Sequence, residues 1–184
     1  VEDKETKLLL DFGKRYSVYG RFFEEYLKPR SASGIVDLLT LGLIPNRLEF
    51  YRADLLAMTG KAAPTQRFLD GILLSHIHYD HSANISFLDE RVPVYSSRVT
   101  QLYAKALIES GRRNIETELY NFKPRPLLDY RTPATTRPFE TFDPGDELKI
   151  GSITVHSYPV DHSVAGATAY LLECSDLSLA YTGD

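Results

Sequence analysis

Three histidines and an aspartate lie within six residues of this sequence, in the pattern His76-x-His78-x-Asp80-His81. The chain has only five histidines, so this segment holds most of them. The apolar run 72–74 directly precedes it, which predicts a buried strand that ends at Ser75 and opens into a loop at a sheet edge. Imidazole nitrogens and carboxylate oxygens are ligands of zinc and of neighbouring first-row metals. The segment therefore favours a fold that delivers a strand end to a metal site.

The alternative to a metal site is a cluster of hydrogen-bonded polar side chains, which is the usual environment of a single histidine at a strand end. Four such groups without a metal would crowd charge and polarity at a buried strand end, which is energetically costly. His76 and His78 are two residues apart and can point the same way, because side chains alternate along a strand. Asp80 and His81 then turn towards a second point. These features favour a metal site over a polar cluster.

The pattern resembles the HxHxDH signature of the metallo-β-lactamase superfamily, and three other segments resemble that family's signatures in the same order. They are a strand that ends in an aspartate (Thr6–Gly13), a single downstream histidine (Val160–Ala167) and a strand that ends in Thr-Gly-Asp (Tyr181–Asp184). The resemblance implies an α/β fold, part of the αβ/βα sandwich with a mixed sheet and flanking helices. It also implies that the family's last histidine ligand follows Asp184. We therefore expect residues 1–184 to form a partial metallo-β-lactamase domain, truncated after the strand ending in Thr-Gly-Asp.

The same resemblance implies the metal ligands. Three histidines bind one metal, a neighbouring pair binds a second, and one carboxylate bridges the two metals: His76, His78 and His162, then Asp80 and His81, then Asp184. Asp11 would support the metal loop from outside the ligand set, as carboxylates near metal sites do. Zinc is the expected ion in both sites, and manganese is an alternative. A hydroxide that bridges the metals would attack the substrate, so the expected catalytic residues are Asp80, His162 and Asp184.

Residues 14–60 separate the first strand from the histidine segment and predict a helical insertion. Aromatic residues recur every three or four positions along its first part, as on one helix face, at Tyr16, Tyr19, Phe23 and Tyr26. Gly20 weakens this helix and Pro29 stops it. Two interpretations stay open. Such a stripe usually marks a buried core face, but aromatic rings could also stack on the bases of a nucleic acid.

The remainder of the chain predicts one long helix and several strands. Residues 99–107 carry apolar side chains on one helix face, with a serine at 96 or 97 to cap the helix and Gly111 to end it. Patterned apolar runs predict strands at 147–150, 153–158, 168–173 and 177–181. His162 and Asp184 follow two of these strands, so the expected ligands all lie just past strand ends. His156 lies inside a strand, and we expect it to be structural.

Composition and charge set limits on location and partners. The chain has no apolar run long enough to cross a bilayer, and its single cysteine excludes an internal disulfide, so we expect a cytoplasmic protein. The net charge of −4 argues against a general nucleic-acid coat. Between Arg91 and Arg137, however, nine basic residues stand against four acidic ones. These basic residues could bind the phosphates of a nucleic acid, or they could form an ordinary solvated surface.

Three functions remain open at this point. Residues 161–167 resemble the corresponding segment of the ribonuclease J and β-CASP nucleases, which implies a phosphodiesterase that acts on RNA or DNA, with RNA as the expected partner. A hydrolase of thioesters, lactones or β-lactams on the same scaffold is the second candidate. The third is a metal-binding fragment that is inactive on its own, because the resemblance places one histidine ligand and a nucleic-acid clamp beyond Asp184.

Overall fold

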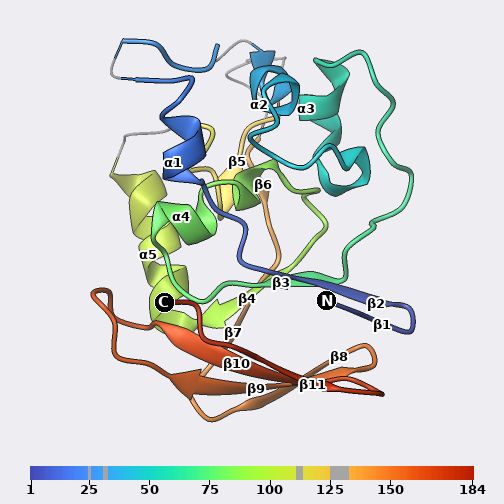
Figure 1. Ribbon diagram of the computed structural model, residues 1–184, viewed down its shortest axis with the longest axis vertical. Helices are drawn as coiled ribbons and strands as arrows, with labels where there is room; N and C mark the ends of the chain where they lie inside the picture. The colour runs from blue at the N-terminus through green and yellow to red at the C-terminus, as the bar shows by residue number, and fades with distance from the viewer. Residues whose placement is uncertain (25, 31–32, 111–113, 125–132) are drawn as a thin grey trace.

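The chain forms two layers of β-sheet, with helices on the outer side of one of them (Figure 1). The computed structural model describes residues 1–184 apart from residues 25, 31–32, 111–113 and 125–132. Within that part, helices and strands alternate along the first half of the chain, and strands dominate the second half. The predicted α/β class, with a mixed sheet and flanking helices, is confirmed.

The first sheet contains the strand that leads into the histidine segment. Its order is β1 (Glu2–Asp3), β2 (Thr6–Leu10), β3 (Gly71–Leu73), β4 (Val94–Ser97) and β7 (Phe139–Phe142). Strands β2, β3, β4 and β7 are parallel to one another, and β1 is antiparallel to β2. Every residue of β3 is buried, as expected for a central parallel strand that is covered on both faces. Gly71 has no room for a side chain, because an added Cβ would lie 2.6 Å from the Tyr95 ring on β4.

The second sheet is antiparallel throughout. Its order is β11 (Ser178–Tyr181), β10 (Thr168–Glu173), β9 (Ile153–Pro159) and β8 (Glu147–Ile150). These strands agree with the four predicted ones to within one residue at each end. Burial alternates along β9, so that Ile153 and Val155 face inward while His156 lies on the more exposed face. Inward side chains of the two sheets form a shared core: Leu8, Leu73, Phe142, Ile150, Ile153, Val155, Tyr170 and Leu172.

The side of the first sheet that faces away from the second carries the helices (Figure 1). The longest is α5 (Arg98–Glu109), which begins where predicted because the Ser97 side chain accepts a hydrogen bond from the Thr100 amide at 3.3 Å. Its buried Ala104 joins the core that lies over β3 and β4. The predicted helix end at Gly111 lies outside the described residues. The smaller elements on this side are α4 (Tyr79–Ser82), η3 (Ile85–Phe87) and the pair β5 (Asn121–Phe122) and β6 (Thr135–Thr136).

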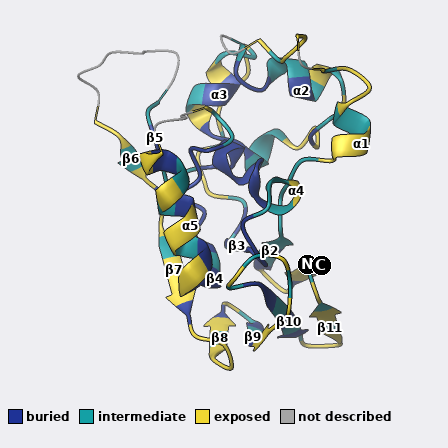
Figure 2. Cartoon of the chain, turned by 90° about the vertical axis from the view of Figure 1, so that its left-hand side faces the viewer, coloured by how far each residue is buried: buried dark blue, intermediate teal, exposed yellow. Residues whose placement is uncertain are grey.

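In the described part of residues 14–60 the helices are all short, and they gather around a buried cluster of their own (Figure 2). They are α1 (Tyr16–Tyr19), α2 (Val36–Thr40), η2 (Leu48–Phe50) and α3 (Ala53–Ala57). The expected aromatic helix is cut to the four residues of α1, with Gly20 as its C-cap. The aromatic stripe is therefore divided. Tyr19 and Phe23 pack against the buried cluster, whereas Tyr16 is 55% exposed and Tyr26 is 89% exposed.

Arg137 is completely buried and ties the segment before β7 to the loop before β4. Its guanidinium donates hydrogen bonds to three backbone carbonyls, at Leu88 (2.7 Å), Asp89 (2.6 Å) and Val92 (3.2 Å). We expect Arg137→Ala to lower the free energy of unfolding by about 3–5 kcal/mol, because buried acceptors lose their donors and a cavity remains. Urea unfolding followed by circular dichroism measures this change.

A matched control is Arg67→Ala. The Arg67 side chain donates to the carbonyl of Arg91 in the same loop, at 3.3 Å, but is 37% exposed. We expect a loss below about 1 kcal/mol, because water replaces an exposed hydrogen bond. Equal losses for the two variants would contradict a special role for the buried guanidinium.

Candidate metal centre

The predicted ligands come from three strand ends that meet between the two sheets. The histidine segment follows β3, His162 follows β9, and Asp184 follows β11. Two hydrogen bonds hold these ends together across the sheets: the Thr168 amide donates to the Ser75 carbonyl (3.0 Å), and the Tyr170 hydroxyl donates to the Leu74 carbonyl (2.7 Å). The chain thus brings segments about 80–100 residues apart to one point through ordinary strand packing.

Three imidazoles converge in a geometry that fits a metal ion. Nδ1 of His78 lies 3.0 Å from Nε2 of His76 and 3.2 Å from Nε2 of His162. A tetrahedral zinc with ligands at 2.0–2.1 Å separates those ligands by about 3.3–3.4 Å, so the spacing of the nitrogens is close to that of a zinc site. The three residues form one of two groups of potential metal ligands in the described part of the chain.

The hydrogen bonds around His76 set which of its nitrogens carries the proton. The Ser75 hydroxyl lies 2.5 Å from Oδ2 of Asp11, and a carboxylate can only accept, so this hydroxyl donates to Asp11. The same hydroxyl oxygen is 3.0 Å from Nδ1 of His76 and therefore accepts the Nδ1 proton. Nε2 of His76 is left with its lone pair directed at the other imidazoles, as a metal ligand requires.

The electrostatic environment keeps His76 neutral. Burial, followed by the nearby His81, His78 and His162, lowers the pKa of His76 to about 4. His81 has the opposite shift, because its hydrogen bond to the Asp11 carboxylate raises its pKa. Nδ1 of His81 lies 2.7 Å from that carboxylate and donates to it, which leaves Nε2 directed away from Asp11.

The second group of potential ligands consists of His76, His81 and Asp184. Oδ1 of Asp184 lies 3.0 Å from Nε2 of His81, while its Oδ2 lies 3.8 Å from Nε2 of His162 and 4.0 Å from Nε2 of His76. One carboxylate therefore has an oxygen directed at each group. The bridging role between two metals that the sequence prediction assigned to Asp184 remains a prediction.

Asp80 is the predicted ligand that lies farthest from the others. Its Oδ2 is 3.9 Å from Nε2 of His81, its side chain is 48% exposed, and it belongs to neither group. The structure thus places five of the six predicted ligands in the two groups and Asp80 at their margin. The assignment of all six as ligands remains a prediction.

Asp11 is the hydrogen-bond hub beneath the site. Oδ1 accepts from the Ser75 amide at 2.7 Å, and Oδ2 accepts from Ser75, His81 and Tyr181 at 2.5–2.7 Å. The backbone of Asp11 has a positive φ of 51°, a conformation that aspartate tolerates better than most residues. This geometry agrees with the supporting role expected for Asp11.

Four residues that support the site were not singled out from the sequence. Ser75 and Tyr181 contact Asp11, and neither residue type signals such a role before the segments are packed. Gly13 and Gly183 let neighbouring segments approach the backbone closely. A Cβ added at Gly13 would lie 1.8 Å from the Asp80 carbonyl oxygen, and one added at Gly183 would lie 2.8 Å from the Ser75 hydroxyl. Their sequence signal was present, because an isolated glycine just past a strand often marks close backbone approach.

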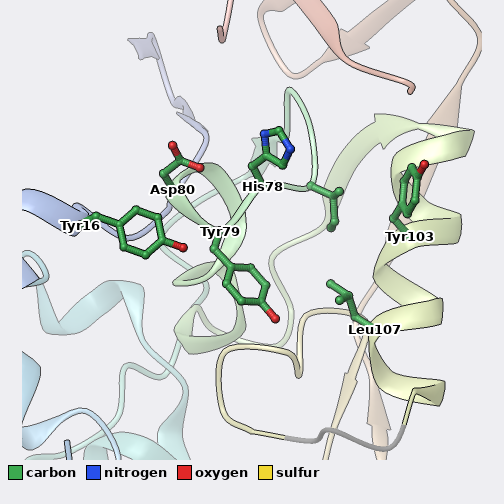
Figure 3. A pocket seen from close by; sticks show the side chains of 7 residues that line it. Tyr16, His78, Tyr79, Asp80, Tyr103 and Leu107 are labelled. Carbon is green, nitrogen blue, oxygen red and sulfur yellow. The ribbon is translucent and has the colours of Figure 1, made fainter. Parts of the chain in front are cut away.

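Asp80 lines two separate hollows. A pocket of about 370 Å³ lies between the histidine segment and α5, and Figure 3 shows His78, Asp80, Tyr79 and Tyr103 around it. A second hollow of about 500 Å³ is bordered by Asp80, His81 and Arg15. A substrate at the candidate metal centre therefore has space in two hollows that both reach Asp80.

Three of the five described members of the basic surplus between Arg91 and Arg137 are buried or have a partner within the protein. Arg137 is buried, and Arg91 forms an ion pair of 2.6 Å with Asp89. Lys105 donates to Gln101 at 3.2 Å. Four further members of the surplus lie outside the described residues: Arg112, Arg113, Arg125 and Arg131. Among the described residues, this region favours the solvated and structural interpretation over a phosphate-binding patch.

Comparison with protein families gives one match over most of the chain. The family described as "Beta-lactamase superfamily domain" matches residues 51–184, which include every predicted metal ligand. Within the described residues, no helix combines the length and apolar character needed to span a membrane.

Individual relatives are similar over parts of their length. "Endoribonuclease ysh-1" of Neurospora crassa is 30% identical over 123 residues, which cover 63% of this chain and 14% of the relative. "Endoribonuclease YSH1" of Gibberella zeae is 31% identical over 121 residues, with the same coverage. A crystal structure of a protein of unknown function from Enterococcus faecalis V583 aligns with all of this chain and 39% of its own, at 28% identity and a TM-score of 0.71. The matched region therefore spans about one seventh of these curated relatives.

Proposed function

We propose that this chain, which belongs to the β-lactamase superfamily of metal-dependent hydrolases, is part of a phosphodiesterase that cleaves RNA or DNA. The observation that carries the proposal is the convergence of three imidazole nitrogens at 3.0–3.2 Å beside the carboxylate of Asp184. Such donor sets suit zinc, and manganese suits the oxygen-rich side. The proposed ligands are those of the sequence prediction: His76, His78, Asp80, His81, His162 and Asp184.

The side chains have distinct parts in this proposal. His76, His78 and His162 present lone pairs to one point, and Asp184 places an oxygen towards each ligand group. A divalent metal held there would lower the pKa of water and neutralise negative charge that develops on the substrate. The exposed carboxylate of Asp80, which lines both hollows, would orient the attacking water by accepting its hydrogen bond.

Two observations support a nucleic-acid substrate. The two curated relatives described above are named endoribonucleases, although the chain spans only 14% of their length. The two hollows that Asp80 lines also suit a polymer that extends beyond the cleaved bond. A hydrolase of thioesters, lactones or β-lactams is the alternative on the same site. A metal-binding domain that is inactive on its own is the other.

We also propose that residues 14–60 are a helical insertion in a partial metallo-β-lactamase domain at 1–184. Their short helices pack around a separate cluster of buried residues rather than extending either sheet. The family match begins at residue 51, after most of this region. Both facts support an addition to the common fold.

The test of function compares substrate classes on the zinc-loaded or manganese-loaded protein. Labelled RNA and DNA, a thioester, a lactone and a β-lactam are offered in parallel, and products are measured by electrophoresis or chromatography. We expect cleavage of the nucleic acid, and we expect Asp80→Ala to reduce it by at least about 100-fold, the range for loss of a positioned acid–base group.

Each other result selects an alternative. Turnover of esters or lactams without cleavage of nucleic acid would support the second candidate. A protein that binds two metals but turns over none of these substrates would support the metal-binding domain. Unchanged cleavage of RNA by the Asp80→Ala variant would contradict the role assigned to Asp80.

A further inference from the structure

The pocket of about 370 Å³ beside the candidate metal centre has an apolar and aromatic lining. Figure 3 shows Tyr79 on one side of it, Tyr103 and Leu107 on the other, and His78 and Asp80 at its upper edge. A ligand that fills the pocket therefore touches the same segment that supplies the proposed metal ligands. The volume falls within the range of ligand-binding pockets in proteins.

The α5 side of the pocket is built from one helix stripe. Tyr103 and Leu107 are four residues apart, and Val99 lies another four residues earlier, so the three side chains share a face. This face differs from the buried one, which holds Ala104 and Ile108. Val99 is 39% exposed and Tyr103 is 40% exposed, whereas Leu107 packs partly against the core, so the described chain leaves the first two residues of the stripe incompletely covered.

The stripe runs alongside the loop that carries His162. The position of a Cβ at Gly166, in that loop, lies 2.7 Å from Cβ of Val99. The apolar face of α5 therefore begins beside one segment of the candidate metal centre and ends in the pocket beside another. An exposed apolar face in this position is where the non-reacting part of a substrate would lie.

We propose that this pocket is a nucleobase subsite, in which a base adjacent to the cleaved phosphodiester stacks between Tyr79 and the Tyr103–Leu107 face of α5. This inference rests on the proposed phosphodiesterase function. Aromatic rings stack on the face that every base has. The base would enter the pocket while its phosphate reaches the segment of His78 and Asp80.

The lining also indicates how selective the subsite is. Among the described residues, its polar groups are tyrosine hydroxyls and the side chains of His78 and Asp80, and no asparagine, glutamine or arginine borders it. Base identity is read by paired donors and acceptors on base edges, which this lining lacks. The subsite therefore accepts different bases, and it requires an unstacked base, because the faces of a base in a duplex are already covered.

The test measures binding to the metal-loaded protein by fluorescence anisotropy. The probes are fluorescein-labelled eight-nucleotide single strands with phosphorothioate linkages, either with thymine at every position or fully abasic. We expect the base-bearing probe to bind more tightly, and Tyr103→Ala to weaken its binding about 5- to 100-fold. Tyr103→Phe keeps the ring and should stay within about twofold of wild type, because the hydroxyl is not needed for stacking.

A matched control is Leu102→Ala, which removes an exposed apolar side chain from the same helix outside the pocket. It should leave both probes unaffected, and the affinity for the abasic probe should be the same in all variants. Equal wild-type binding of the two probes would overturn the subsite. An equal effect of Tyr103→Ala on both probes would also overturn it.

The subsite and the proposed function fail in different ways. If the protein cleaves RNA but Tyr103→Ala has no base-dependent effect, the subsite is wrong and the phosphodiesterase stands. If base-dependent binding is lost in Tyr103→Ala but no phosphodiester is cleaved, the ring-binding pocket stands and the assigned reaction is wrong. Preferential binding of an aromatic β-lactam over the base-bearing probe would overturn the nucleobase as its occupant.

Discussion

The His76→Ala variant is expected to lose metal from both ligand groups and to retain less than about one thousandth of the wild-type hydrolytic rate. His76 is the residue common to the two groups, and its side chain is 1% exposed. Metal ions contribute several kcal/mol of charge stabilisation in such hydrolases, and 4 kcal/mol corresponds to about a thousandfold in rate. The measurement is metal content per chain by elemental analysis after dialysis, together with cleavage of labelled RNA.

His156→Ala provides the matched control for this variant. His156 lies on the exposed face of β9, between Glu147 (3.8 Å) and Glu173 (3.5 Å), and belongs to neither ligand group. We expect its metal content and activity to equal those of the wild type. If His76→Ala keeps the wild-type metal content, the three imidazoles are a polar cluster and not a metal site.

The Asp11→Asn variant is expected to bind metal about 10- to 100-fold more weakly, the usual effect of removing a partner behind a ligand. In the wild type, Ser75, His81 and Tyr181 all donate hydrogen bonds to a carboxylate oxygen of Asp11. The asparagine amide would place an NH₂ group, itself a donor, against at least one of them. His81 then loses the acceptor that holds its proton on Nδ1. Asparagine tolerates the positive φ of residue 11, so this substitution tests the charge and not the backbone.

The same variant should also be less stable. We expect the free energy of unfolding without metal to fall by about 2–4 kcal/mol, because buried donors lose a shared acceptor. Metal titration and urea unfolding measure the two effects separately. Asp70→Asn is the control: its carboxylate accepts from the Lys7 amide (2.8 Å) at the opposite end of β2 and β3, away from the site. An Asp11→Asn protein that binds metal as tightly as Asp70→Asn would contradict the supporting role of Asp11.

Patterns along short segments predicted the elements that carry the site. These patterns correctly predicted the strand before the histidine segment, the N-terminal cap of α5 and the four strands of the second sheet. Each of these features depends on residues that are neighbours in the sequence. The structure around the aromatic stripe of residues 14–60 was predicted less well. Its periodicity indicates one helix face, but the helix ends at Gly20, so Tyr16 and Tyr26 are exposed while Tyr19 and Phe23 are packed.

Charge counts along the chain were the weakest guide. Arg137 was counted with a basic surplus, but it is buried and donates to three carbonyls. A count of charges does not distinguish a solvated arginine from a buried one that donates hydrogen bonds to backbone carbonyls in the core. That distinction depends on which carbonyls the fold leaves without strand or helix partners.

The sequence by itself determined the candidate ligands and their order along the chain, through the resemblance to a known family, and their places after strand ends, through local periodicity. Only the tertiary structure decided which atoms meet. The contact between Asp11 and Tyr181 joins residues 170 positions apart, and that between His78 and His162 joins residues 84 apart. Such distances depend on how the two sheets pack their shared core, and the position of Asp80 at the margin of the ligand groups follows from the same packing.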